Sequence, residues 1–220
     1  IGQKENGLTQ WRMAADLDPS SALACRNVGF GEGQKGNYEE ALKYYDKAIK
    51  NNPDDPLLFA ESDKICEKAG VPAIQRQKRL ETGLKTVMKY DDAVIRLLKV
   101  YNETGNWNKA IKIMDSRHFH LWEGGGEIHD IYVMSHILKG KSLLDRKAYK
   151  KAMEEFRLAT LYPDNLEVPA PAKSVTIEDV IAEMRQELND NYAKFGDEDS
   201  VSKAKSLDEL EKLVKEIKMK

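Results

Sequence analysis

Residues of the same kind recur 34 positions apart along this chain, and this spacing limits the fold more than any other feature of the sequence. The clearest unit spans residues 22–53 and reads ALACRNVGFGEGQKGNYEEALKYYDKAIKNNP. Trp11, Ala14 and Pro19 each stand 34 residues before an aromatic residue, an alanine and a proline of this unit. A fixed period of this length indicates a stacked-repeat architecture, in which each repeat is one supersecondary unit. An isolated helical hairpin is excluded, because it would have no copies.

Two amphipathic helices folded back to back account for the residues of this unit. Gly29 lies where the helices are expected to cross, and a side chain there would hold the two backbones apart. Ala41 and Ala48 are two helical turns apart, and Tyr45 lies between them on the same stripe. Gly36 supplies the conformational freedom that a tight turn between helices needs.

Further copies follow with less regular spacing. The apolar pattern predicts helices over residues 56–68, 73–88, 91–103, 177–194 and 207–218, and another repeat over residues 131–163. About eight extra residues precede that repeat, in the string HFHLWEGGGE at residues 118–127. A Pro-rich connector, VPAPA, comes after the repeat. The two charged helices beyond it are predicted to form a polar cap, which the end of a stacked array requires.

The order of small, aromatic and proline residues resembles that of the tetratricopeptide repeat (TPR), a 34-residue helix–turn–helix unit. The resemblance implies an all-α fold, a right-handed solenoid of about four antiparallel helix pairs. The expected organisation is the second helix of a truncated repeat over residues 1–19, TPR-like repeats over 20–168 with an inserted loop at 118–130, and the connector with charged C-terminal helices over 169–220. Because the first repeat has only its second helix, we expect the chain to be a piece of a longer protein.

Several strings resemble a narrower family. They include YEEALKYYDKAIKNNPDDPLLFAESD (38–63), KYDDAVIRLLKVYNETGNWNKAI (89–111) and FHLWEGGGEIHDIYV (119–133). These strings are similar to the C-terminal TPR region of large bacterial proteins whose upstream part is an uncharacterised β-rich domain, itself similar to sugar mutarotases. The resemblance implies a partner domain in the same chain and a carbohydrate context, and it assigns no catalytic residue here.

Composition and charge argue against several classes of function. The formal net charge is −2, so no basic excess indicates nucleic acid or an anionic membrane as partner. The apolar runs are too short to span a bilayer. The sequence has no nucleotide-binding loop, Gly-x-Ser-x-Gly or Cys-x-x-Cys motif, so we predict no cofactor and no catalysis. Cys25 and Cys66 fall at interior positions of successive repeats, which predicts free buried thiols and favours a reducing, cytoplasmic compartment.

The inserted loop is the stretch that most resembles a small-molecule site. Its candidate ligand groups are His118, His120, Trp122, Glu123 and Glu127. Their spacing matches no zinc-binding pattern such as His-Glu-x-x-His, so no metal site is predicted. The favoured interpretation is a structural crossover, in which the glycines at 124–126 turn the chain and aromatic residues pin it to the core. The alternative is a carbohydrate-active protein, in which Trp122 stacks on a sugar and Glu123 accepts its hydrogen bonds.

The second candidate site is a groove lined by the first helix of each pair. Counting from the clearest unit, the residues expected to face the groove are Arg26, Asn27, Phe30, Lys64, Lys99, Asn102 and Lys141. Basic and amide side chains in a groove suit an acidic peptide or a C-terminal carboxylate. The alternative is that these side chains are simply solvated, as on any helix surface. The sequence thus predicts a non-catalytic interaction or scaffolding module that binds a protein or peptide, with its own upstream domain and self-association through the N-terminal half-repeat as further candidate contacts.

Overall fold

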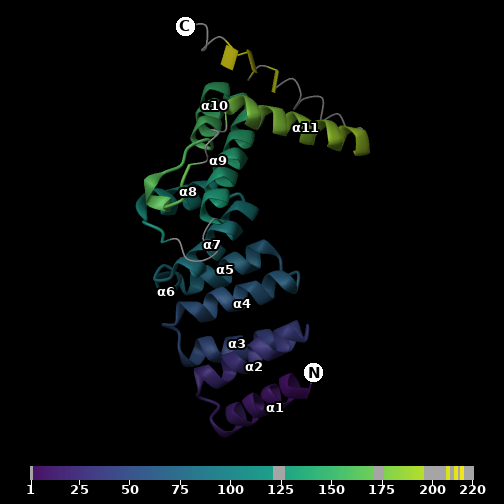
Figure 1. Cartoon of the computed structure of the whole chain (residues 1–220), viewed down its shortest axis with the longest axis vertical. Coiled ribbons are helices and arrows are strands. Elements are labelled where there is room, and N and C mark those ends of the chain that lie inside the picture. The colour runs from purple at the N-terminus through teal and green to yellow at the C-terminus, as the bar shows by residue number, and fades with distance from the viewer. Residues whose placement is uncertain are drawn as a thin grey trace. The chain divides into compact units, whose positions relative to one another are not determined.

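Every regular element of the described chain is a helix, so the predicted all-α fold class is confirmed (Figure 1). The computed structural model describes residues 2–120, 127–170 and 176–195, together with 207–208, 211–212 and 214–215. Contacts divide the chain into two compact units, Ile1–Thr104 and Gly105–Lys220. The boundaries expected near residues 19 and 168 stay predictions.

Unit 1 is a stack of helices joined by short turns. Its helices are α1 (Gly2–Leu17), α2 (Ala22–Gln34), α3 (Tyr38–Asn51), α4 (Pro56–Lys68), α5 (Ala73–Thr82), α6 (Leu84–Val87) and α7 (Asp91–Glu103). Three or four residues join consecutive helices, except that Gly83 alone separates α5 from α6. Turns of three or four residues make the helices on either side run antiparallel. The stack therefore consists of helix pairs, as the repeat predicts.

The pair formed by α2 and α3 has the geometry that its glycines require. A Cβ built on Gly29 would lie 2.9 Å from Cδ2 of the Tyr45 ring, so the two helices approach as closely as a glycine allows. Gly36 has a φ of +82°, the left-handed region that favours glycine, and it turns the chain between α2 and α3. Ser21 caps α2 by accepting a hydrogen bond from the backbone N–H of Ala24. The predicted roles of Gly29 and Gly36 are confirmed.

The second helix of the next pair is broken, which the sequence did not indicate. One helix was expected over residues 73–88, and the structure has α5 and α6 with Gly83 between them. The ring of Phe59 from α4 occupies the space where a side chain at position 83 would stand. The aromatic side chain therefore packs directly on the backbone at the break.

Unit 2 contains a second close-packed pair. Its elements are α8 (Trp107–Ser116), α9 (Glu127–Asp145), α10 (Tyr149–Leu158), the short 3-10 helix η1 (Asp164–Leu166) and α11 (Ile177–Phe195). The ring of Phe156 fills the space beside Gly140, as the ring of Tyr45 does beside Gly29. The predicted correspondence between these two pairs is confirmed.

The first residues of the insertion are fixed to the segment that follows α10. The backbone N–H of buried Phe119 donates to the carbonyl of Asn165 over 2.8 Å. The side-chain amide of Asn165 donates in turn to the carbonyls of Met114 and Arg117, at 2.7 and 2.8 Å. Phe119 therefore packs in the core, as predicted for the aromatic residues of the insertion, while Trp122 lies outside the described residues.

The charged helix α11 packs on the α9–α10 pair as a cap would. Its buried side chains Val180, Ile181 and Met184 join Phe156 in one apolar cluster, which also contains Leu207. Thr176 and Asp179 cap the start of α11 reciprocally: the Thr176 N–H donates to the Asp179 carboxylate, and the Asp179 N–H donates to the Thr176 hydroxyl.

Two further predictions concern thiols and membranes. Cys25 and Cys66 are free and buried, as predicted. None of the described helices combines the length and the apolar character that crossing a bilayer would take.

Candidate functional site

The first helices of unit 1 lie in a row, and ion pairs join each to the next. Arg26 of α2 binds Glu61 of α4 through two hydrogen bonds, Nε to Oε2 at 2.7 Å and Nη2 to Oε1 at 2.5 Å. Arg96 of α7 donates from Nε to Oδ2 of Asp63 on α4 at 2.7 Å. We call the surface of α2, α4 and α7 the first-helix face.

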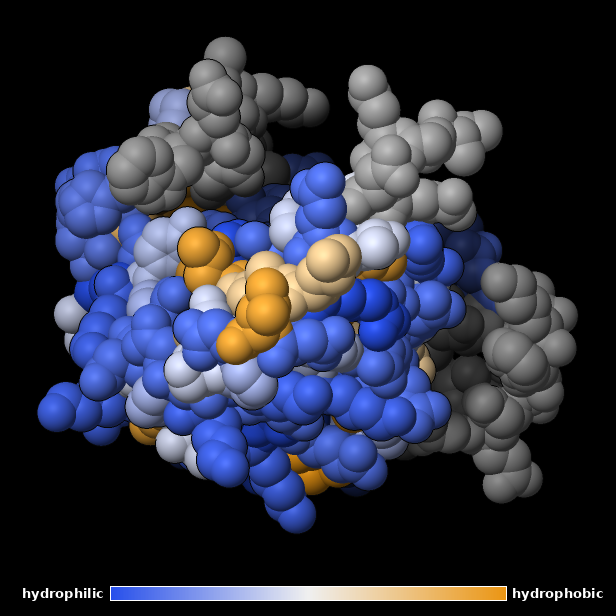
Figure 2. Space-filling model, turned by 90° about the horizontal axis from the view of Figure 1, so that it is seen from below, coloured by the Kyte–Doolittle hydropathy of each residue, from blue (hydrophilic) through white to orange (hydrophobic). Residues whose placement is uncertain are grey.

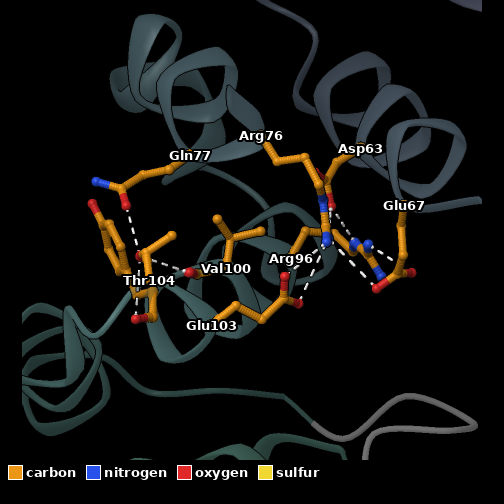
Figure 3. Close-up of polar contacts among 9 residues, drawn as sticks. Asp63, Glu67, Arg76, Gln77, Arg96, Val100, Glu103 and Thr104 are labelled. Carbon is orange, nitrogen blue, oxygen red and sulfur yellow. Dashed lines mark hydrogen bonds and ion pairs between the residues drawn. The ribbon is translucent and has the colours of Figure 1, made fainter. Parts of the chain in front are cut away.

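A buried charge cluster holds α4, α5 and α7 together beneath this face (Figure 3). Asp63 accepts two hydrogen bonds of 2.9 Å from the Arg76 guanidinium as well as the bond from Arg96. Glu103 lies 3.0 Å from Nη1 of Arg76, and Glu67 lies 2.9 Å from Nη2 of Arg96. Asp63 and both arginines are buried, whereas the two glutamates are partly exposed to solvent.

The geometry of the cluster makes it structural. Burial lowers the pKa of Arg76, but the hydrogen bonds and charge of Asp63 outweigh burial and raise that pKa above its ordinary value. A buried charge is tolerated only with a well-placed counter-charge, and here one carboxylate serves two guanidinium groups. The cluster therefore fixes the spacing of α4 and α7.

The position of Asp63 in the 34-residue repeat indicates this cluster, although the cluster was not predicted. Asp63 stands 34 residues after Gly29, at the position where the regular repeat has a small residue in the helix crossing. A carboxylate at an interior position needs a buried partner. Position 63 could thus have been marked as charged and buried, but not paired with Arg76 or Arg96.

The residues predicted to line the groove differ in their exposure to solvent and in whether another residue already binds them. Phe30 is 46% exposed. Lys64 is also exposed, and it makes no ion pair with any residue that the structure describes. Arg26 is occupied by Glu61. Lys99 and Asn102 are half-buried and already have polar partners.

The remaining two predicted groove residues are Asn27 and Lys141. Asn27 lies half-buried on α2. Lys141 lies on α9 in unit 2 and is therefore not placed beside the others. The groove assignment as a whole stays a prediction.

One exposed apolar residue of the first-helix face was missed. Leu23 is 64% exposed and stands seven residues, about two helical turns, before Phe30 on α2. The two side chains consequently lie on one stripe of the helix. Two large apolar residues seven positions apart on the outer face of a helix would have indicated this exposed stripe.

The two histidines of the predicted loop site lie next to each other, whereas His129 has other partners. His118 pairs with Glu167 at 2.6 Å, and the His120 ring lies edge-on to it with centroids 5.3 Å apart. His129 stacks on Tyr162 at 3.8 Å between ring centroids. The described residues contain no group of three or more side chains that could hold a metal ion.

The remaining predicted residues of the loop site are Trp122, Glu123 and Glu127. Trp122 and Glu123 lie outside the described residues, and Glu127 is exposed at the start of α9. The carbohydrate alternative, which depends on Trp122 and Glu123, stays a prediction.

Unit 2 has a buried polar group that sequence reasoning did not single out. Nδ1 of His136 lies 2.8 Å from Glu155, and Lys139 lies 2.7 Å from the other oxygen of that carboxylate. Nε2 of His136 is buried and has no hydrogen-bond partner among the described residues. Burial lowers the pKa of His136, and the hydrogen bond that its ring makes to the Glu155 carboxylate only partly opposes this effect.

Comparison with known families identifies the repeat. Residues 22–55, which contain α2 and α3, match the model of the tetratricopeptide repeat. The match covers one repeat unit, 34 of the 220 residues.

Solved TPR proteins share the fold. The chain is similar to YrrB, described as a TPR protein with an unusual peptide-binding site, at 17% identity and a TM-score of 0.51, over 72% of this chain and 77% of YrrB. It is also similar to MamA, at 14% identity and a TM-score of 0.51, over 76% of this chain and 84% of MamA. These similarities establish a TPR-type fold. They do not bear on the β-rich upstream domain, which stays a prediction.

Proposed function

We propose that this chain is a non-catalytic protein-interaction module that binds a protein or peptide partner on the first-helix face of unit 1. TPR folds typically bind other proteins, and the neighbour YrrB is described as having a peptide-binding site. The observation that carries the proposal for this face is the exposure of Leu23 and Phe30 on one stripe of α2. Exposed apolar side chains that gather on one face mark interaction sites.

The rigidity of the face supports the proposal. The ion pairs from α2 to α4 and from α4 to α7 hold the three helices in register before any partner arrives. A preformed surface loses little conformational entropy on binding, so more of the contact energy appears as affinity.

A site-directed block tests the proposal. Peptides are selected on the wild-type chain from a random phage-displayed library and then tested on a variant that carries Asn27→Cys coupled to a bulky maleimide. Native Cys25 and Cys66 are buried and should not react. The matched control places the same label at Lys50→Cys, on the exposed surface of α3. We expect the label at position 27 to abolish binding and the label at position 50 to have no effect.

Two results would contradict the proposal. One is a selection that yields no binding peptide although circular dichroism shows a folded chain. The other is a set of peptides that bind equally well whether or not position 27 is blocked.

A second candidate function is self-association through α1. Figure 2 shows, from the end where α1 lies, apolar side chains gathered in one patch. The exposed apolar residues of α1 are Met13 (59% exposed) and Leu17 (85% exposed), four residues apart on one stripe. Ala14, also exposed, lies beside this stripe and would let a second helix approach closely.

Sedimentation velocity over a range of concentrations tests self-association. We expect a concentration-dependent dimer that Leu17→Glu abolishes, because the substitution places a charge in the apolar contact. Ile74→Glu on α5 is the control, since Ile74 is also apolar and exposed (52%) but lies on a helix other than α1. A chain that stays monomeric at high concentration would exclude this function.

A further inference from the structure

We infer that the partner of the first-helix face is an acidic segment with an apolar anchor, whose anchor packs on Leu23 and Phe30 and whose carboxylate binds Lys64. This inference rests on the proposed function and specifies the chemistry of the partner.

The ion pair between Arg26 and Glu61 places Phe30 beside Lys64. Because α3 runs antiparallel to both neighbours, α2 and α4 run in the same direction. Phe30 follows Arg26 by four residues, and Lys64 follows Glu61 by three. Each side chain therefore lies about one turn beyond its end of the ion pair, on adjacent helices and on the same face.

The charges of this part of the face do not cancel at Lys64. The guanidinium of Arg26 is neutralised by Glu61. Lys64 and Lys68, one turn apart on α4, are exposed and make no ion pair with the residues that the structure describes. The positive charge left over beside Phe30 is complementary to a carboxylate, and its attraction would favour acidic over basic partners.

The apolar half of the site is the stripe of α2. Leu23 and Phe30 flank Arg26 and Asn27, so an apolar side chain placed between them would contact both while polar groups border it. Aromatic residues contribute a large contact area at a low cost in conformational entropy, and they dominate many interfaces.

The spacing of the helices sets the spacing of the motif. Packed helices have axes about 8–10 Å apart, and a chain in the polyproline II conformation advances about 3.1 Å per residue and brings every third side chain to the same side. An apolar side chain over α2 and a carboxylate over α4 therefore correspond to residues three apart. The predicted motif is apolar-x-x-acid.

Four fluorescein-labelled peptides of otherwise identical sequence test the inference by fluorescence polarisation. They combine Leu or Ala at the anchor position with Glu or Lys three residues later. We expect the Leu–Glu peptide to bind at least about tenfold more tightly than either single change, a difference of about 1.4 kcal/mol. The preference for Glu over Lys should weaken as salt is added, because the contact is exposed.

Variants of the chain assign the two halves of the motif. Phe30→Ala should remove the preference for Leu over Ala, and Lys64→Glu should reverse the preference for Glu over Lys. Ile74→Ala removes an exposed apolar side chain on α5, and Lys50→Glu reverses an exposed charge on α3. These two control variants should leave both preferences unchanged.

The outcomes separate the inference from the proposed function. If library peptides bind and are blocked by the label at position 27, but the four peptides show no preference, the chemistry inferred here is wrong and the interaction function stands. If no library peptide binds, both fail. If the preferences persist in Phe30→Ala and Lys64→Glu, the site lies elsewhere and the inference is overturned.

Discussion

Asp63 balances two buried arginines, and this single carboxylate offers the sharpest test of the packing of unit 1. We expect Asp63→Ala to lower the free energy of unfolding by about 3–5 kcal/mol, because it leaves the guanidinium groups of Arg76 and Arg96 without their shared counter-charge. Urea denaturation monitored by circular dichroism measures the change.

The matched control for Asp63 is Asp46→Ala. Asp46 pairs with Arg79 at 2.6 Å, but Asp46 is exposed and Arg79 is partly exposed and also donates to Ser62. The loss of such a surface pair should cost less than about 1 kcal/mol. If the two substitutions cost the same, the buried cluster does not hold α4, α5 and α7 together.

Gly29 and Gly7 have opposite surroundings and predict opposite effects for the same substitution. A Cβ at Gly29 would meet the Tyr45 ring at 2.9 Å, so Gly29→Ala should destabilise the chain by about 1–3 kcal/mol through overpacking. A Cβ at Gly7 would meet nothing within 4 Å. Gly7→Ala should therefore be neutral or stabilise α1 by up to about 1 kcal/mol. Thermal or chemical unfolding measures both, and equal effects would refute this account of the crossing.

At the scale of single elements, the start of α11 depends on Thr176. Thr176→Ala removes the hydroxyl that accepts the N–H of Asp179, and we expect a loss of about 1 kcal/mol of local helix stability. Amide hydrogen exchange in the first turn of α11 should accelerate correspondingly. Thr160→Ala is the control, because the Thr160 hydroxyl donates to the carbonyl of Arg157 and caps no helix N-terminus. Unchanged exchange in Thr176→Ala would contradict the capping role.

His136 makes the α9–α10 pair sensitive to acid. Its pKa is lower in the folded chain than the ordinary value of about 6.5, so the unfolded chain binds the proton more readily. Stability contributed by neutral His136 is present above about pH 6.5 and is lost as the pH falls below it. The slope from this one group is at most about 1.4 kcal/mol per pH unit.

The contribution of His136 can be isolated by substitution. We expect His136→Gln to flatten the fall in unfolding free energy between pH 7.5 and 5.5, whereas His120→Gln, which replaces an exposed imidazole, should not. Parallel curves for the wild type and His136→Gln would show that protonation of His136 is not linked to unfolding.

Elements with strong local signals were the ones that the sequence predicted well. The expected bounds of α4 and α7 agree with Pro56–Lys68 and Asp91–Glu103, because an N-terminal proline in one case and two aspartates in the other mark the helix starts. The break at Gly83 was not predicted because it depends on the Phe59 ring of another helix. The cluster around Asp63 was not predicted for the same reason, since the partners of Asp63 come from α5 and α7.

For the candidate site, the sequence predicts exposed positions better than it predicts which charges are neutralised. Phe30 and Lys64 are exposed on α2 and α4, while their role in a groove stays a prediction. The basic character expected from Arg26 is reduced by Glu61, a pairing across 35 residues that helix periodicity alone does not reveal. What periodicity predicts is which residues share a face, and not which side chains neutralise one another.

At the scale of the whole molecule, we expect the TPR-type array to bind its partner on the first helices of unit 1. Hydrogen–deuterium exchange of the chain, with and without a peptide selected from the library, shows which helices the partner covers. We predict that the peptide slows exchange in α2 and α4, and at the adjoining surface of α7, while α3 and α5 stay unchanged. Slowed exchange confined to α3, α5 or unit 2 would contradict the account.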